Sequence, residues 1–81
     1  MWRFVAPAPI EAAHVLWCFH GGRGIAPDPF AEMLIRAIGY APEPTLLQLA
    51  TLFPGYASAV VCAKDGDFDK LREAAGEFVK G

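Results

Sequence analysis

Proline divides this chain into short segments, and that division limits what the chain can fold into. A Pro-x-Pro element recurs three times, each time just ahead of apolar residues with helical spacing. The six prolines are Pro7 and Pro9, Pro27 and Pro29, and Pro42 and Pro44. The second proline of each element suits the first position of a helix, where no N–H is required and the fixed φ is already helical. Pro54 must end or kink the helix that precedes it. The pattern therefore predicts several short helices.

The chain is 81 residues long, which is enough for one small domain with one hydrophobic core. We expect a single helical domain over residues 1–81, with an N-terminal arm at 1–9, a segment at 10–24 and a helical core at 28–80. Hydrophobic residues make up 54% of the chain, against about 45–50% in ordinary soluble domains. A domain this small cannot bury all of them, so the surplus must face a second copy, a foreign partner or water.

The clearest helical pattern runs from Asp28 to Gly39, with Asp28 as a favourable N-cap and Gly39 as the stop. Five apolar residues follow the i, i+3, i+4, i+7, i+8 spacing of a buried face. These residues are Phe30, Met33, Leu34, Ala37 and Ile38. Glu32 and Arg36 are spaced as an ion pair on the solvent side. Ile35 lies outside the stripe, so this helix is apolar over much of its circumference, and we expect it to be central.

Three further segments have apolar faces at helical spacing. Their apolar residues are Leu46, Leu49, Ala50 and Phe53; Tyr56, Ala59, Val60 and Ala63; and Phe68, Leu71, Ala75, Phe78 and Val79. The last segment starts at Asp67, a favourable N-cap, and Gly76 weakens its end. The run 56–63 is also short enough for a buried strand, and the sequence leaves that alternative open.

The segment at 10–24 has two interpretations. Helical spacing relates Ile10, Ala13, His14 and Trp17, whereas the composition of residues 15–19 favours a strand. We favour the helix, followed by a flexible glycine-rich loop at 21–24. Together the segments predict an all-α fold, a compact bundle of four to five short helices with an aromatic N-terminal arm.

The stretches FAEMLIRAI and LFPGYASAV, preceded by a loop that contains His and Gly, resemble small proteins of mycobacteriophages and other actinobacterial phages and prophages. The resemblance covers about half of the chain. The matching residues are Phe30, Leu34, Ile35, Ala37, Ile38, Leu49, Ala50, Phe53, Pro54, Ala59 and Val60. Where that pattern has a polar and basic segment, this chain has the leucine-rich run 45–49. The resemblance implies a phage origin and a helical fold, and it implies no activity.

Nucleic acid is not expected as the main partner. The formal net charge is -2, and the 7 Lys and Arg residues are scattered along the chain. Binding to phosphate backbones requires clustered positive charge. A helix-turn-helix regulator formed by Leu46 to Phe53 and Tyr56 to Lys64 is nevertheless an alternative, and it would have to work with almost no basic residues.

Residue patterns for catalysis or metal binding are weak. The side chains of metal-ligand type are His14, Cys18, His20 and Cys62, and a zinc site would need Cys62 brought in from far along the chain. We interpret them as partly buried histidines and core thiols, and a small metal- or thiol-dependent enzyme is the weaker alternative. The spacing of Asp65, Asp67 and Asp69 matches the first ligand positions of a calcium-binding loop. The rest of the loop does not match, because Lys70 and Gly76 stand where Gly and Glu are required.

The glutamates do not form an acid–base pair, since each occupies a first-turn or solvated helix position. They are Glu11, Glu32, Glu43, Glu73 and Glu77. We therefore expect a protein that is not an enzyme and has no catalytic, cofactor or metal site.

The remaining feature is a set of apolar residues, most of them near the termini or off the main stripes. They are Trp2, Phe4, Trp17, Phe19, Tyr40, Leu46, Leu47 and Leu52. Aromatic residues in such positions are typical interface anchors, and the alternative is that they cover a small core. We predict a phage-type protein that binds a host or phage protein or assembles with itself as a homo-oligomer. No apolar run suits a signal peptide or a membrane span, so we expect it in the cytoplasm of the bacterial host.

Overall fold

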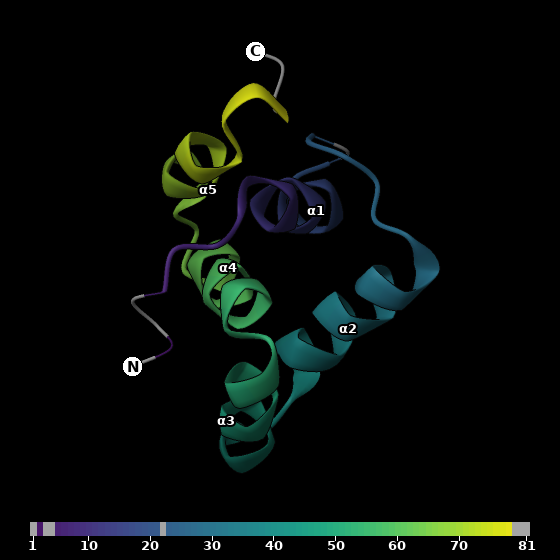
Figure 1. Ribbon diagram of the computed structural model, residues 1–81, viewed down its shortest axis with the longest axis vertical. Coiled ribbons are helices and arrows are strands. Elements are labelled where there is room, and N and C mark those ends of the chain that lie inside the picture. Colours follow the sequence, from purple (N-terminus) through teal and green to yellow (C-terminus); the bar gives the residue numbers. More distant parts are fainter. Residues whose placement is uncertain (1, 3–4, 22, 79–81) are drawn as a thin grey trace.

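The computed structural model describes residues 2, 5–21 and 23–78 (Figure 1). Within these ranges the regular structure is helical, with no strand. The elements are α1 (Pro9–Phe19), α2 (Pro29–Tyr40), α3 (Glu43–Leu52), α4 (Pro54–Lys64), α5 (Phe68–Ala75) and the short 3-10 helix η2 (Gly76–Phe78). The all-α prediction is confirmed. Residues 10–19 and 56–63 are helical, so the strand alternatives for both segments were wrong.

The prolines begin the helices largely as their positions predict. Pro9 and Pro29 are the first residues of α1 and α2, where a missing N–H leaves no hydrogen bond unmade. Pro54, which was expected to end the helix before it, is also the first residue of α4. The start of α3 differs by one residue, because Glu43 comes first and Pro44 second. Asp28 occupies the N-cap position of α2 without a side-chain capping bond.

The centre of the molecule is formed by α1 and α4, which lie against each other (Figure 1). Helix α5 packs along α1 and also contacts α4, α2 flanks the pair, and α3 contacts α4 at the far end. The expectation that α2 is central was wrong, because α2 is covered from one side only. The Cα atoms span 36 × 25 × 19 Å.

The buried face of α1 differs from its prediction. Ala12, Ala13, Val15 and Leu16 point inward, and α4 and α5 both pack against α1. The predicted inward residues Ile10 and Trp17 are 38% and 36% exposed. Alanine has the smaller side chain and allows the closer helix approach, so it occupies the crowded side.

The buried face of α2 was also predicted incorrectly. Its inward residues are Ala31, Leu34, Ile35 and Ile38, and Ile35 is fully buried. Of the five residues assigned to the core, only Leu34 and Ile38 are buried, whereas Phe30, Met33 and Ala37 are exposed. Both sides of α2 have helical apolar spacing, and the contacts with α4 and α1 select the side that contains Ile35.

The inward faces of α3, α4 and α5 agree with their predicted stripes. Ala50, Ala59, Val60, Ala63, Leu71 and Ala75 are buried, and Leu46, Leu49, Phe53, Tyr56 and Phe68 pack against them half-buried. Phe78 is 36% exposed, and Val79 lies outside the described residues. The Asp67 carboxylate accepts the Lys70 N–H at 3.3 Å, which confirms the predicted cap of α5.

The glycine-rich connector after α1 returns to that helix. Gly24 has φ +90°, and a Cβ built on it would lie 2.3 Å from the carbonyl oxygen of Ala13. That same oxygen accepts the N–H of Ile25 at 3.3 Å. Glycine is therefore required at this position for both its backbone conformation and its close approach.

Candidate protein-binding surface

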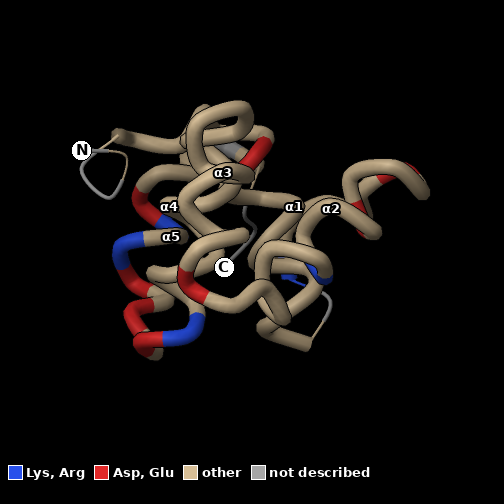
Figure 2. Tube along the Cα trace, turned by 90° about the horizontal axis from the view of Figure 1, so that it is seen from below, with Lys and Arg blue, Asp and Glu red and all other residues tan. Residues whose placement is uncertain are grey.

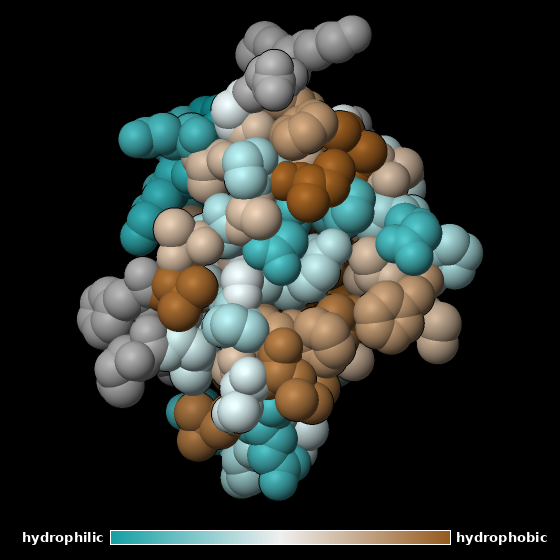
Figure 3. All heavy atoms as spheres, viewed as in Figure 1, coloured by the Kyte–Doolittle hydropathy of each residue, from teal (hydrophilic) through white to brown (hydrophobic). Residues whose placement is uncertain are grey.

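Helix α2 presents an apolar stripe to solvent. Phe30, Met33, Ala37 and Tyr40, which we call the α2 stripe, are separated by three, four and three residues. This spacing places them along one side of a helix, as the a and d positions of a heptad are. Phe30, Met33 and Tyr40 are 64%, 71% and 87% exposed. Figure 3 shows brown and tan side chains gathered on the face that contains α2 and the adjoining end of α3.

The α2 stripe stands on a well-anchored helix. The inward side of α2 is buried in the core, and the Lys64 ammonium donates a 2.9 Å hydrogen bond to the Gly39 carbonyl near the helix end. Along one flank, Arg36 donates to the Glu32 carboxylate at 2.8 Å, which confirms the predicted ion pair. The Phe30 ring meets Phe53 edge to face, with centroids 6.3 Å apart. The stripe therefore projects from a scaffold that holds its position.

Five of the eight interface candidates from the sequence are exposed. Trp17, Phe19 and Tyr40 line a groove of about 340 Å³ between the end of α1 and α2. Leu47 and Leu52 on α3 are 48% and 72% exposed. These positions are consistent with an interface role, which stays a prediction.

Of the other three candidates, two are half-buried and one lies outside the described residues. Trp2 and Leu46 are half-buried and pack against the core, as the alternative interpretation of these residues anticipated. Phe4 lies outside the described residues.

Sequence reasoning missed three members of the α2 stripe because it assigned Phe30, Met33 and Ala37 to the core. A signal for them exists in the pattern. Helix α2 has enough apolar residues for two faces, and Ile35, which lies outside the first apolar stripe, indicates the second. A helix at the edge of a small domain can bury only one of its two apolar faces.

A polar contact between α1 and α4 lies beside Gly55. His14 Nδ1 and the Tyr56 hydroxyl are 2.8 Å apart, and their rings stack with centroids 6.1 Å apart. Partial burial lowers the pKa of His14, against the opposing effect of Asp28 and Glu11. Burial raises the pKa of Tyr56, with further contributions from the same two carboxylates. Neutral His14 bonded to neutral Tyr56 is thus a structural contact between the two central helices.

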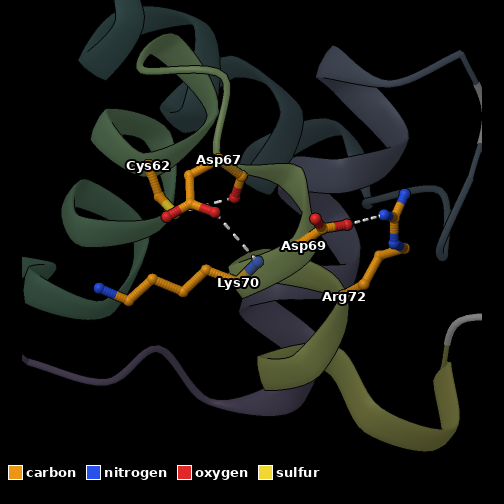
Figure 4. A network of polar contacts seen from close by, with 5 residues as sticks. All are labelled: Cys62, Asp67, Asp69, Lys70 and Arg72. Atoms are coloured by element: carbon orange, nitrogen blue, oxygen red, sulfur yellow. Dashed lines mark hydrogen bonds and ion pairs between the residues drawn. The ribbon is translucent and has the colours of Figure 1, made fainter.

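The two cysteines are free thiols with suppressed reactivity. Burial raises the pKa of both Cys18 and Cys62, which disfavours the nucleophilic thiolate. Figure 4 shows the Cys62 thiol directed at the backbone of Asp67, to whose carbonyl it donates at 3.3 Å. His20 stacks on Phe68, with ring centroids 4.5 Å apart. Across the described ranges, no three side chains of metal-ligand type converge on one point.

Two of the three aspartates of the incomplete calcium loop have structural partners for their carboxylates. Asp67 caps α5 and Asp69 pairs with Arg72, as Figure 4 shows. Figure 2 shows that blue and red residues gather along the end of α4 and α5, whereas α3 is almost entirely tan. The charges of both signs are intermingled there, so they do not make a basic face.

The helix-turn-helix alternative gains no support from α3 and α4. A single residue, Phe53, separates these helices, whereas the motif uses a turn of about three to four residues. Ala57, Ala59 and Val60 of α4 are buried in the core, although a recognition helix must enter a groove of DNA.

Comparison of the chain with protein-family models, curated proteins and solved structures found no match. Among the described residues, none of the helices combines the length and the apolarity needed to cross a bilayer.

Proposed function

We propose that this is a small non-enzymatic protein of phage type that acts in the bacterial cytoplasm through protein–protein interaction at the α2 stripe, with a foreign protein or with a second copy of itself. The observation that carries the proposal is the exposure of Phe30, Met33 and Tyr40 on one side of a helix whose other side is in the core. Solvent exposure of three large apolar side chains in a row is unfavourable unless a partner covers them.

The composition of the α2 stripe suits a protein partner. Aromatic residues and methionine are enriched at the centres of interfaces, and arginine is enriched near them. Arg36 lies one turn before Tyr40 on the same flank of α2, where its side chain is 67% exposed and that of its partner Glu32 is 34% exposed. A partner helix that packs along α2 would contact the apolar α2 stripe, with this ion pair along one edge of the contact.

A capture experiment with matched variants tests the proposal. The tagged chain is used as bait in a mycobacterial lysate, beside Met33→Glu on the α2 stripe and Leu47→Glu on α3. Both variants replace an exposed apolar side chain with the same charge, so both should keep the fold, which circular dichroism checks. We expect proteins retained by the native chain and by Leu47→Glu to be lost with Met33→Glu. Equal retention by all three baits, or retention of nothing by a strictly monomeric native chain, contradicts the proposal.

A further inference from the structure

We infer that the occupant of the α2 stripe is the α2 stripe of a second copy, paired antiparallel about a two-fold axis that crosses the interface at the level of Ile35 along the helix. This inference rests on the proposed function, because it identifies the partner of the same surface. A two-fold interface must be complementary to itself, so that residue i meets residue j and residue j meets residue i. The α2 stripe meets this condition.

The spacing of the α2 stripe is symmetric about Ile35. Phe30 and Tyr40 stand at equal distances from Ile35 along the helix, as do Met33 and Ala37. In an antiparallel pair, Met33 therefore meets Ala37 of the second copy, and Phe30 meets its Tyr40. A large residue faces a small one at the centre, and two aromatic rings face each other at each end. The three-four-three spacing suits helices that cross at about 20°.

The charges beside the α2 stripe are also compatible with this pairing. Arg36 stands one residue after Ile35 and Glu32 three residues before it. Reversal of the second helix brings its Glu32 to within about 3 Å of Arg36 along the axis. Each Arg36 then has two carboxylates in reach, the Glu32 it already pairs with at 2.8 Å and the one from the second copy. Two positive and two negative charges alternate in this network, so no net charge is left at the interface.

The exposed area predicts a weak dimer. Phe30, Met33 and Tyr40 at their observed exposures present about 440 Å² per copy, given about 200 Å² for a large exposed side chain. Two copies would bury about 900 Å² from these residues, below the roughly 1,600 Å² of a standard stable interface. The dimer should therefore form reversibly, with dissociation in the micromolar to sub-millimolar range.

Light scattering and sedimentation equilibrium from about 10 µM to about 1 mM test the association. The average mass of the native chain should rise from near 8.7 kDa toward twice that value. Met33→Glu should raise the dissociation constant at least tenfold, whereas Leu47→Glu on α3 should leave it within twofold. Tyr40→Lys, at a position 87% exposed, gives an independent variant in case Met33→Glu impairs folding. A mass that stays at one chain over the whole range, or equal effects of the α2 and α3 variants, overturns the inference.

Disulfide trapping tests the antiparallel register. Met33→Cys and Ala37→Cys are made separately in a Cys18→Ala, Cys62→Ala chain, and the two proteins are mixed under air oxidation. The antiparallel pair predicts that the mixed disulfide between positions 33 and 37 forms at least fivefold faster than either symmetric one. Preferred 33–33 and 37–37 disulfides indicate a parallel pair and overturn the register. A monomer that still loses captured proteins on Met33→Glu overturns only the self-pairing and leaves the proposed function standing.

Discussion

Replacement of Gly55 by alanine should reveal an energetic coupling between α1 and α4. Gly55 is buried in the first turn of α4, directly against the Glu11 carboxylate of α1. A Cβ on residue 55 would lie 2.0 Å from Glu11 Oε1 and 2.7 Å from its Cδ. Ordinary contact begins at 3.4 Å, so the carboxylate must retreat by 1.4 Å, the difference between the two distances.

The cost follows from what Glu11 does at its present position. Its Oε1 accepts the Ala8 N–H at 2.8 Å and so satisfies a free donor at the start of α1. Loss of such a capping bond costs about 0.5–2 kcal/mol. Alanine in place of glycine within a helix gains up to about 1 kcal/mol. We expect the two to combine so that Gly55→Ala alone is neutral or destabilises by about 1 kcal/mol.

Removal of the carboxylate should reverse the sign. In a Glu11→Ala chain the obstacle is absent, so Gly55→Ala should stabilise the fold by about 0.5–1 kcal/mol. The coupling free energy is then about 1–2 kcal/mol, as expected for residues in contact. Thermal unfolding of the four chains measures it, since 1 kcal/mol shifts Tm by about 4–8 °C in a domain of this size. An equal rise in Tm from Gly55→Ala in both backgrounds would refute the reasoning.

Three other predictions concern the core, His14 and the thiols. Ile35→Ala should destabilise the fold by about 2–5 kcal/mol, whereas Met33→Ala on the outer side of α2 should change the free energy of unfolding by less than about 0.5 kcal/mol. Urea unfolding measures both free energies, and similar losses for the two variants would contradict the inward and outward faces assigned to α2. The folded state lowers the pKa of His14, so between the folded pKa and pH 6.5 the unfolded chain binds more protons than the folded one. The contribution of neutral His14 to the free energy of unfolding is therefore fully present above pH 6.5 and is lost as pH falls from 6.5 through the folded pKa. The pH dependence of Tm between about pH 5 and 8 should accordingly be shallower in His14→Gln, and an unchanged slope would refute the assignment. Alkylation of Cys18 and Cys62 by iodoacetamide at neutral pH should be much slower in the folded protein than in urea, because burial raises the pKa of both thiols; equal rates would contradict it.

The helix boundaries and three of the five helix faces were predictable from the sequence. Proline restricts φ and removes a donor wherever it stands, so Pro9 and Pro29 indicate helix starts, and Pro54 indicates a helix end, independently of the tertiary fold. In α3, α4 and α5 a single apolar stripe gives the inward side directly. Leu71 and Val60, for example, are buried as their spacing predicts.

The faces of α1 and α2 were not predictable, because both helices have apolar residues on most sides. Periodicity cannot show which of two apolar stripes faces the core. Tertiary contacts decide it, for example those formed by small residues such as Ala12 and Ala13. The same ambiguity hid the candidate surface. Tyr40 was expected at an interface because it lies off the main apolar stripe of its helix. Phe30 and Met33 have core-type side chains, and only the edge position of α2 exposes them.

The central claim is that the α2 stripe pairs with the α2 stripe of a second copy, and a dilution series followed by ¹⁵N–¹H correlation spectra tests it most directly. We predict that amide shifts of α2 residues, above all Met33, Ala37 and Tyr40, move with concentration, while those of α5 remain constant. Met33→Glu should abolish these movements. Spectra in which α2 is insensitive to concentration, or in which the largest shifts fall on α5, would contradict the account.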